Sequence, residues 1–151
     1  MAMIKVMECA HFDSKLPYPQ YETEMAAGAD LRACFEDRGT LTIEPGQRLL
    51  IGTGLMFEIE PGFEVQIRPR SGLSLKTGLM VVNSPGTIDA DYRGEIKIIL
   101  GNLGNKAETI QHGDRIAQML VAPVTQAKFA MACELSTTER AEGGFGSTGL
   151  Q

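Results

Sequence analysis

The sequence predicts an all-β protein, a sandwich or barrel of short antiparallel strands. Its 17 glycines and seven prolines divide 151 residues into short runs of β-branched and aliphatic residues, a spacing typical of that architecture. Phe63, Val65 and Ile67 alternate with polar residues, so one face of their strand is expected to be buried. A chain of this length fits one domain with a sizeable core.

The first strand is expected over residues 4–7. Two prolines in residues 16–21 would remove donors from a sheet, so this stretch is expected to be a surface loop. Residues 26–35 begin with small side chains and end in a further predicted strand.

Two Glu-Pro-Gly turns organise the next part of the chain. The apolar runs 41–43 and 56–59 each lead into such a turn, with proline and glycine placed as a type II turn requires. Residues 47–51 and 63–67 are the strands expected to emerge from the two turns.

The second half continues the pattern with one interruption. Residues 68–76 are polar and basic and are compatible with one helical turn, and residues 86–96 are expected to form a polar hairpin. The remaining strands are predicted at residues 79–82, 95–100, 108–110, 115–121 and 127–131. From residue 134 the apolar content almost disappears, so this tail is expected to be mobile on its own. The predicted division is a β domain over residues 1–133 and a flexible tail over 134–151.

Charge and cysteine content narrow the function. A net charge of −5 argues against non-specific binding to nucleic acid or to an anionic membrane. Cys9, Cys34 and Cys133 have no zinc-type spacing and are expected to be free thiols in a reducing compartment. His11 and His112 are far apart in sequence, so a histidine-based metal site is not expected. With no signal-peptide pattern and no membrane-length apolar run, a cytoplasmic location is predicted.

The stretch 86–96 carries the densest chemistry. Asp89 and Asp91 would share a face on an extended backbone, with Tyr92 opposite unless the chain turns. A carboxylate and an aromatic ring between two glycines suit a reaction site, but on this stretch alone a plain β-turn is favoured. Asn83, just before this stretch, sits in a predicted turn or presents its amide to a base edge.

Three other sites could hold an anion, a metal or a polar core contact. Arg70, Ser71 and Gly72 can cradle phosphate oxygens or form an ordinary loop. Asp30 could serve a metal ion or cap a turn. Gln118 lies in an apolar run, where a hydrogen-bonded core glutamine is the default interpretation.

The glycine-rich tail has a similar double interpretation. It lacks the Lys-Ser/Thr end of a Walker-type phosphate loop. Arg140, Ser147 and Thr148 could close on an anionic ligand while Phe145 stacks on a flat ring, which would contribute about 1–3 kcal/mol. The alternative is a disordered terminus that happens to contain a phenylalanine.

Together these pieces resemble the five ordered motifs of the homotrimeric dUTPases. The matching segments are residues 27–33, 70–74, 86–95, 113–118 and 140–149. Each motif alone is weak, whereas all five in order are highly specific. One departure is Ala141, where the family usually has glycine, and this could slow closure of the tail slightly.

The resemblance implies a distorted jelly-roll, a homotrimer with three sites shared between subunits, and a tail that closes over a neighbour's site. It implies hydrolysis of dUTP to dUMP and pyrophosphate with Mg²⁺, which removes dUTP and supplies dUMP for thymidylate synthesis. Asp30 would hold the metal through its water shell, and Ser71 would contact the oxygen that bridges the α- and β-phosphates. Asp89 would polarise the attacking water, and Gln118 would fix that water or the α-phosphate.

Substrate selection follows from the same resemblance. Tyr92 would pack under the sugar and exclude a 2′-OH, and a narrow hairpin slot would exclude the methyl group of thymine. Cytosine would leave polar groups mispaired, at about 1–3 kcal/mol each. The substrate-binding residues implied are Arg70, Ser71, Gly72, Asn83, Gly86, Thr87, Ile88, Asp89, Tyr92, Lys97, Arg140, Phe145, Gly146, Ser147 and Thr148.

Two alternatives compete with this assignment. A dCTP deaminase is similar in fold, but it is expected to lack the glycine-rich tail and to carry a different acid–base set. A jelly-roll trimer without activity that binds a protein partner is the second alternative. The intact set of Arg70, Ser71, Asp89, Tyr92 and Phe145 argues against lost catalysis.

Overall fold

The computed structural model describes residues 2–144, which form strands and one short helix. In chain order the elements are β1 (Ile4–Glu8), β2 (Ala29–Arg32), β3 (Thr40–Ile43), β4 (Arg48–Ile59), β5 (Phe63–Arg68), α1 (Ser71–Lys76), β6 (Leu79–Val81), β7 (Gly86–Ile88), β8 (Glu95–Asn102), β9 (Glu108–Gln111) and β10 (Arg115–Pro123). The predicted all-β class and the helical turn within residues 68–76 are both confirmed. None of the helices in this part of the chain is long and apolar enough to cross a membrane.

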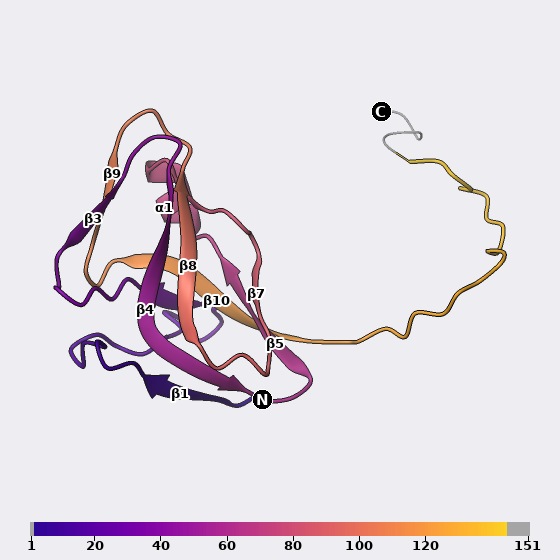
Figure 1. Ribbon diagram of the computed structural model, residues 1–151, viewed down its shortest axis with the longest axis horizontal. Coiled ribbons are helices and arrows are strands. Elements are labelled where there is room, and N and C mark those ends of the chain that lie inside the picture. The colour runs from indigo at the N-terminus through magenta and orange to yellow at the C-terminus, as the bar shows by residue number, and fades with distance from the viewer. Residues whose placement is uncertain (1, 145–151) are drawn as a thin grey trace.

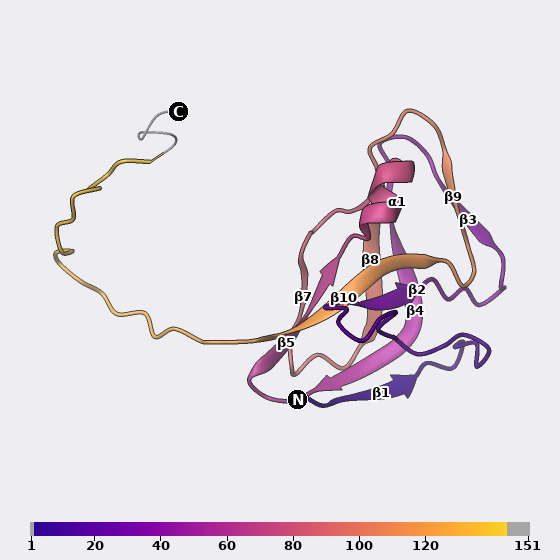
Figure 2. The ribbon, with the colours of Figure 1, turned by 180° about the vertical axis from the view of Figure 1, so that it is seen from behind.

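Two four-stranded antiparallel sheets form the body of the molecule (Figures 1 and 2). One sheet has the order β1-β4-β8-β6 and the other β2-β10-β5-β7, while β3 and β9 pair separately. Side chains from both sheets meet in a single core, in which Ile51 and Ile98 come from the first sheet and Val65 and Ala117 from the second. This arrangement agrees with the expected jelly-roll.

The Pro-Gly turns and the alternating strand appear as predicted. Gly46 and Gly62 have φ values of +77° and +90°, the left-handed conformation that a type II turn needs at this position. The turns close with hydrogen bonds from the Gln47 amide to the Glu44 carbonyl (3.0 Å) and from the Phe63 amide to the Glu60 carbonyl (3.2 Å). In β5, Val65 and Ile67 are buried, which confirms the face assigned from the alternation.

β4 corrects one prediction, because residues 48–51 of the first predicted strand and the run 56–59 belong to a single strand of 12 residues. Its register against β8 shifts between Gly52 and Met56. Gly54, with φ of +71°, lies in this irregular stretch. The strand therefore bends and continues instead of ending.

The predicted hairpin at residues 86–96 is wrong. β7 pairs with β5, placing Gly86 opposite Ile67, whereas β8 pairs with β4 and β6. The connecting residues 89–94, here called the corner, carry the chain from one sheet to the other. The chain turns at this corner with a hydrogen bond from the Tyr92 amide to the Asp89 carbonyl (3.1 Å).

Beyond β10 the chain leaves the body as an extended arm, residues 124–144 (Figure 1). The strand predicted at 127–131 is not formed, since no strand of the same chain lies beside it in the described structure. Phe129 and Met131 are almost fully exposed, at 98% and 103%, and Leu135 is exposed as well. The apolar pattern is present in the arm, but residues 2–144 supply no surface that covers Phe129, Met131 or Leu135.

Candidate active site

An acidic side chain on β2 is held between two guanidinium groups. Arg70, which precedes α1, places its Nε 2.7 Å from Oδ1 of Asp30. Arg115, at the start of β10, places its Nη1 3.0 Å from Oδ2. The Asp30 side chain is only 12% exposed, so solvent screens these pairs less than ordinary surface pairs. Each guanidinium has five N–H donors, so both keep donors that Asp30 does not use.

The central position of β10 in its sheet brings three motifs together. Gln118 on β10 lies opposite Asp30 on β2 and opposite Arg68 on β5. Its side-chain amide donates to the Pro69 carbonyl (2.9 Å), directly before Arg70. A Cβ on Gly28 would overlap the Gln118 side-chain oxygen, so this glycine gives the amide its space.

Ser71 and Gly72 form the first turn of α1 beside Arg70, and both are exposed. A side chain at Gly72 would meet open space, so its lack of a Cβ leaves the backbone accessible from that side. Arg70, Ser71 and Gly72 therefore place a guanidinium, a hydroxyl and accessible backbone next to one another, and their role as a phosphate cradle stays a prediction.

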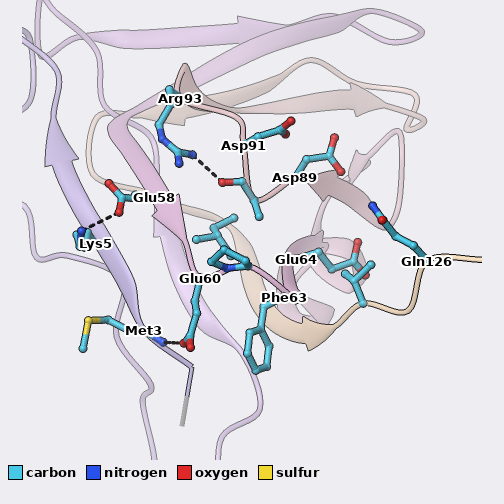
Figure 3. Close-up of a pocket in the computed structure, with 15 residues that line it drawn as sticks. Met3, Lys5, Glu58, Glu60, Phe63, Glu64, Asp89, Asp91, Arg93 and Gln126 are labelled. Carbon is cyan, nitrogen blue, oxygen red and sulfur yellow. Dashed lines mark hydrogen bonds and ion pairs between the residues drawn. The ribbon is translucent and has the colours of Figure 1, made fainter.

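The corner holds the second group of predicted residues. Asp89 is exposed, and Tyr92 is 45% exposed with its hydroxyl donating to the Glu95 carbonyl (3.2 Å). Figure 3 shows the carboxylates of Asp89 and Asp91 on one side of the corner, while Arg93 turns toward the Ala90 carbonyl, to which it donates at 2.7 Å. The chain turns here, so the two carboxylates share a side without the extended backbone from which this was expected.

Residues before the corner extend this second group. Asn83 and Thr87 are exposed, and Ile88 is half-buried. A Cβ on Gly86 would approach the Asn83 amide nitrogen to 3.0 Å, so this buried glycine packs closely under Asn83. Asn83 and Gly86 flank a cis bond between Ser84 and Pro85.

A groove of about 1160 Å³ lies along the corner (Figure 3). Its walls come from the N-terminal strand, the β4–β5 turn, the corner and the start of the arm. Asp89 lines this groove, whereas Asp30, Arg70, Ser71 and Gln118 do not. Within residues 2–144 no hydrogen bond or ion pair joins the corner to the Asp30–Arg70–Arg115 cluster. One chain therefore presents two separate sets of functional groups.

The other predicted residues lie apart from these two sets. Lys97 on β8 contacts Glu95 (Nζ–Oε2 3.4 Å) and lines a different cavity from the groove of Asp89. Arg140 lies on the exposed arm and donates to the Gly143 carbonyl (2.8 Å). Ala141, next to it, has φ of +43°, a conformation that favours glycine. Phe145, Gly146, Ser147 and Thr148 lie outside the described residues.

Sequence reasoning did not identify Arg115 as part of the site. Its Nη1 lies 3.0 Å from Asp30 and 3.3 Å from Oε1 of Glu22, so it joins the loop before β2 to the cluster. Its backbone carbonyl also accepts from Arg70 (3.4 Å). The sequence shows Arg115 only as an arginine three residues before Gln118. It did not reveal which strands pair with this one, so the contact with Asp30 could not be predicted.

Comparisons with known proteins agree on one family. The dUTPase family model matches residues 14–149. Deoxyuridine 5′-triphosphate nucleotidohydrolase of Roseobacter denitrificans is 58% identical over 137 residues, which is 91% of this chain and 90% of the relative. The same enzyme of Bdellovibrio bacteriovorus is 53% identical over 146 residues, covering 97% and 95% of the two chains.

Solved structures show the same fold. The dUTPase of Staphylococcus bacteriophage 80alpha with dUpNHpp is similar with a TM-score of 0.82 and 26% identity, covering 98% of this chain and 99% of that one. A mutant dUTPase from phage phi11 of S. aureus, described with a structural Mg(II) ion, gives a TM-score of 0.74 at 22% identity over 87% and 97% of the chains. At that identity the second likeness is one of fold alone.

Proposed function

Because the chain belongs to the dUTPase family and hydrolyses dUTP to dUMP and pyrophosphate, we propose that Asp89 activates the water that attacks the α-phosphorus. The observation that carries this assignment is the pair of separate residue sets. One set offers guanidinium and hydroxyl donors for a triphosphate, and the other offers a free carboxylate beside an exposed aromatic ring. The substrate joins the two.

The residue set around Asp30, Arg70 and Ser71, here called the phosphate set, supplies the positive charge that a triphosphate needs. The chain has a net charge of −5, so a triphosphate needs local cations that override the overall field. Asp30 fixes Arg70 through a bond of 2.7 Å, which orients the guanidinium before substrate arrives. Preorganised donors of this kind stabilise charge as it develops in the transition state.

Asp30 is suited to bind Mg²⁺ indirectly, through water molecules on the ion. Both carboxylate oxygens of Asp30 are already engaged by arginines, so a direct metal bond would have to displace one of them. Asp30 is therefore suited to hold the water shell of the ion, as the sequence suggested, and the phosphates would supply the direct ligands. When bound, the ion would neutralise charge on the phosphates and the leaving group.

Asp89 is free to act on water. Among the described residues its carboxylate takes part in no hydrogen bond or ion pair, so both oxygens can accept from a water and from the ribose 3′-OH. Gln118 keeps its amide oxygen and one N–H after donating to Pro69, and these fix the same water or the α-phosphate. The water gives a proton to Asp89 as its oxygen forms the new bond to phosphorus. The bond from phosphorus to the bridging oxygen breaks as Ser71 donates a hydrogen bond to that oxygen, and pyrophosphate leaves.

The corner and the residues before it select the nucleotide. Tyr92, fixed by its hydroxyl on the Glu95 carbonyl, presents its ring to the sugar and leaves no room for a 2′-OH. Asn83 and the backbone of Thr87 and Ile88 read the uracil edge. The Lys97 side chain faces Glu95 and a separate cavity, so any contribution from this position to base reading would come from its backbone.

A homotrimer would join what one chain keeps apart. In the described part of the chain, Phe129, Met131 and Leu135 are exposed on the arm, and β1 is an edge strand with a partner on one side only. We expect the arm to pack on a neighbouring subunit and residues 134–151 to close over that subunit's site, with Phe145 stacking on the base. Each site would then combine the phosphate set, the corner and the tail of different chains.

The test is pyrophosphate release from dUTP, measured beside dTTP, dCTP and UTP with Mg²⁺ present. Release from dUTP alone supports the assignment. Ammonia released from dCTP would identify a deaminase instead, and no release from any nucleotide would favour the protein-binding alternative. Light scattering of the same sample gives the mass of the assembly, and a mass other than three chains would contradict the trimer.

A further inference from the structure

A thiol, an imidazole and a carboxylate meet at a point outside both residue sets of the proposed active site. Cys9 follows β1, His11 lies two residues further, and Glu95 begins β8. Their possible ligand atoms all lie within 4.8 Å of one another, and all three residues are half-buried. This cluster was not expected from the sequence, because Glu95 is 84 positions from His11.

The bend in β4 holds the three side chains in place. The Cys9 amide donates to the Gly54 carbonyl (2.8 Å), and Oε1 of Glu95 accepts from the Gly54 amide (2.9 Å). The same oxygen lies 3.1 Å from Nε2 of His11. Two distant segments are therefore fixed to one residue of β4, so the cluster belongs to the folded body.

The cluster also has an entrance. A surface cavity of about 590 Å³ is lined by His11, Glu95 and Lys97, among others. The exposed fractions of the His11 and Glu95 side chains are 29% and 14%, so the cavity reaches both while most of each stays shielded. An ion could enter through this cavity, and a water could fill a fourth position from the same side.

We propose that Cys9, His11 and Glu95 bind a divalent ion of the zinc class, with water as the fourth ligand. Sulfur, imidazole nitrogen and carboxylate oxygen are the ligands that Zn²⁺ takes in proteins. Zinc bonds of 2.0–2.3 Å place tetrahedral ligand atoms roughly 3.5 Å apart. Side-chain rotations that move the ligand atoms by about 1 Å would therefore bring them into tetrahedral positions. Mg²⁺ prefers oxygen ligands in octahedral geometry and is not expected here.

Binding has a simple proton balance. Burial, followed by the neighbouring Glu95, raises the pKa of the Cys9 thiol, so the sulfur is protonated before an ion arrives. The ion replaces that proton, which leaves to solvent, and takes the Nε2 position of His11 that now faces Glu95, so the ring hydrogen lies on Nδ1 in the bound form. No electron is transferred, and the thiolate and carboxylate together offset the charge of the ion.

The positive charge of Lys97 opposes zinc binding, so changing this residue tests whether the ion binds at the cluster. Its ammonium lies 3.4 Å from Oε2 of Glu95, where it competes with an incoming cation for the carboxylate. Removing this charge in Lys97→Met should therefore tighten zinc binding, because like charges no longer repel. A weaker affinity in this variant would place the ion elsewhere.

The experiment uses the full chain in excess Mg²⁺, which occupies oxygen-ligand sites. Co²⁺ is titrated as a spectroscopic probe, and Zn²⁺ affinity is measured in competition with a chromophoric chelator. The wild type should give a thiolate-to-cobalt charge-transfer band that saturates at one ion per chain. Cys133→Ser is the matched control, since Cys133 is exposed on the arm and should leave the band unchanged.

Two variants decide the outcome. Loss of an outer-shell partner alone typically costs about 10–100-fold in metal affinity, so loss of a ligand in Cys9→Ser or His11→Gln should cost at least about 100-fold. Cys9→Ser should also lose the band, with an unchanged melting temperature in chelator as evidence of folding. A band that survives in Cys9→Ser, or a wild type without saturable binding, would overturn the proposal. None of these measurements depends on dUTP hydrolysis.

Discussion

Replacing Asp89 by Asn should separate catalysis from folding. General acid–base groups typically contribute 10²–10⁴-fold, so turnover of dUTP should fall by about that factor, or about 3–5 kcal/mol of transition-state stabilisation. Stability should hardly change, because the exposed Asp89 side chain makes no hydrogen bond or ion pair among the described residues. Such a surface substitution usually stays within about 0.5 kcal/mol, or about 1–2 °C in Tm for a domain of this size.

Asp91 supplies the matched control. It is exposed two residues away on the same side of the corner (Figure 3), so Asp91→Asn makes the same chemical change without touching the proposed base. Single-turnover release of pyrophosphate measures the chemical step, binding of a non-hydrolysable dUTP analogue checks the site, and thermal unfolding checks the fold.

Three results would refute the reasoning. Equal losses of turnover in Asp89→Asn and Asp91→Asn would show that general charge in the groove matters and no single base does. Unchanged turnover in Asp89→Asn would remove its role altogether. A drop in Tm far above 2 °C would show that Asp89 supports the fold through contacts that the structure does not contain.

Three further predictions concern the arm and the Asp30–Arg70–Arg115 cluster. Truncation before Arg140 should abolish most activity while thermal unfolding and the mass of the assembly stay unchanged; a matching fall in Tm would make the tail structural. Ala141→Gly should raise kcat/KM about fivefold, because a side chain at φ of +43° costs about 1 kcal/mol that glycine avoids; steady-state kinetics would count a decrease against this. Asp30→Asn should lower stability by about 1–3 kcal/mol and weaken Mg²⁺-dependent turnover, because Arg70 and Arg115 lose an anionic partner. Urea unfolding measures the first effect, and unchanged stability would show that solvent already screens the pair.

Local signals predicted much of this fold. The Pro-Gly turns and the alternation in β5 depend on neighbouring residues only, and both are confirmed. The hairpin predicted at 86–96 was wrong because its two strands pair with strands elsewhere in the chain. No pattern within residues 86–96 encodes those partners. The two halves of β4 were predicted as separate strands, whereas one strand continues through a shift of its register against β8.

The candidate site shows the same difference between local patterns and contacts distant in sequence. The motif residues could be recognised in order, but the link from Arg115 to Asp30 needs the pairing of β10 with β2. The Cys9–His11–Glu95 cluster likewise depends on the bend at Gly54. Contacts between side chains far apart in sequence remain invisible until the strand order is known.

Packing of the arm on a neighbouring subunit, as proposed above, would tie the working enzyme to its own concentration. Phe129, Met131 and Leu135 are exposed among the described residues, and association would bury their apolar surface. Stability and activity would then follow mass action and decline together on dilution. Newly made chains would be most open to proteases along residues 124–144 before partners arrive, so scarcity of the protein would shorten its own lifetime.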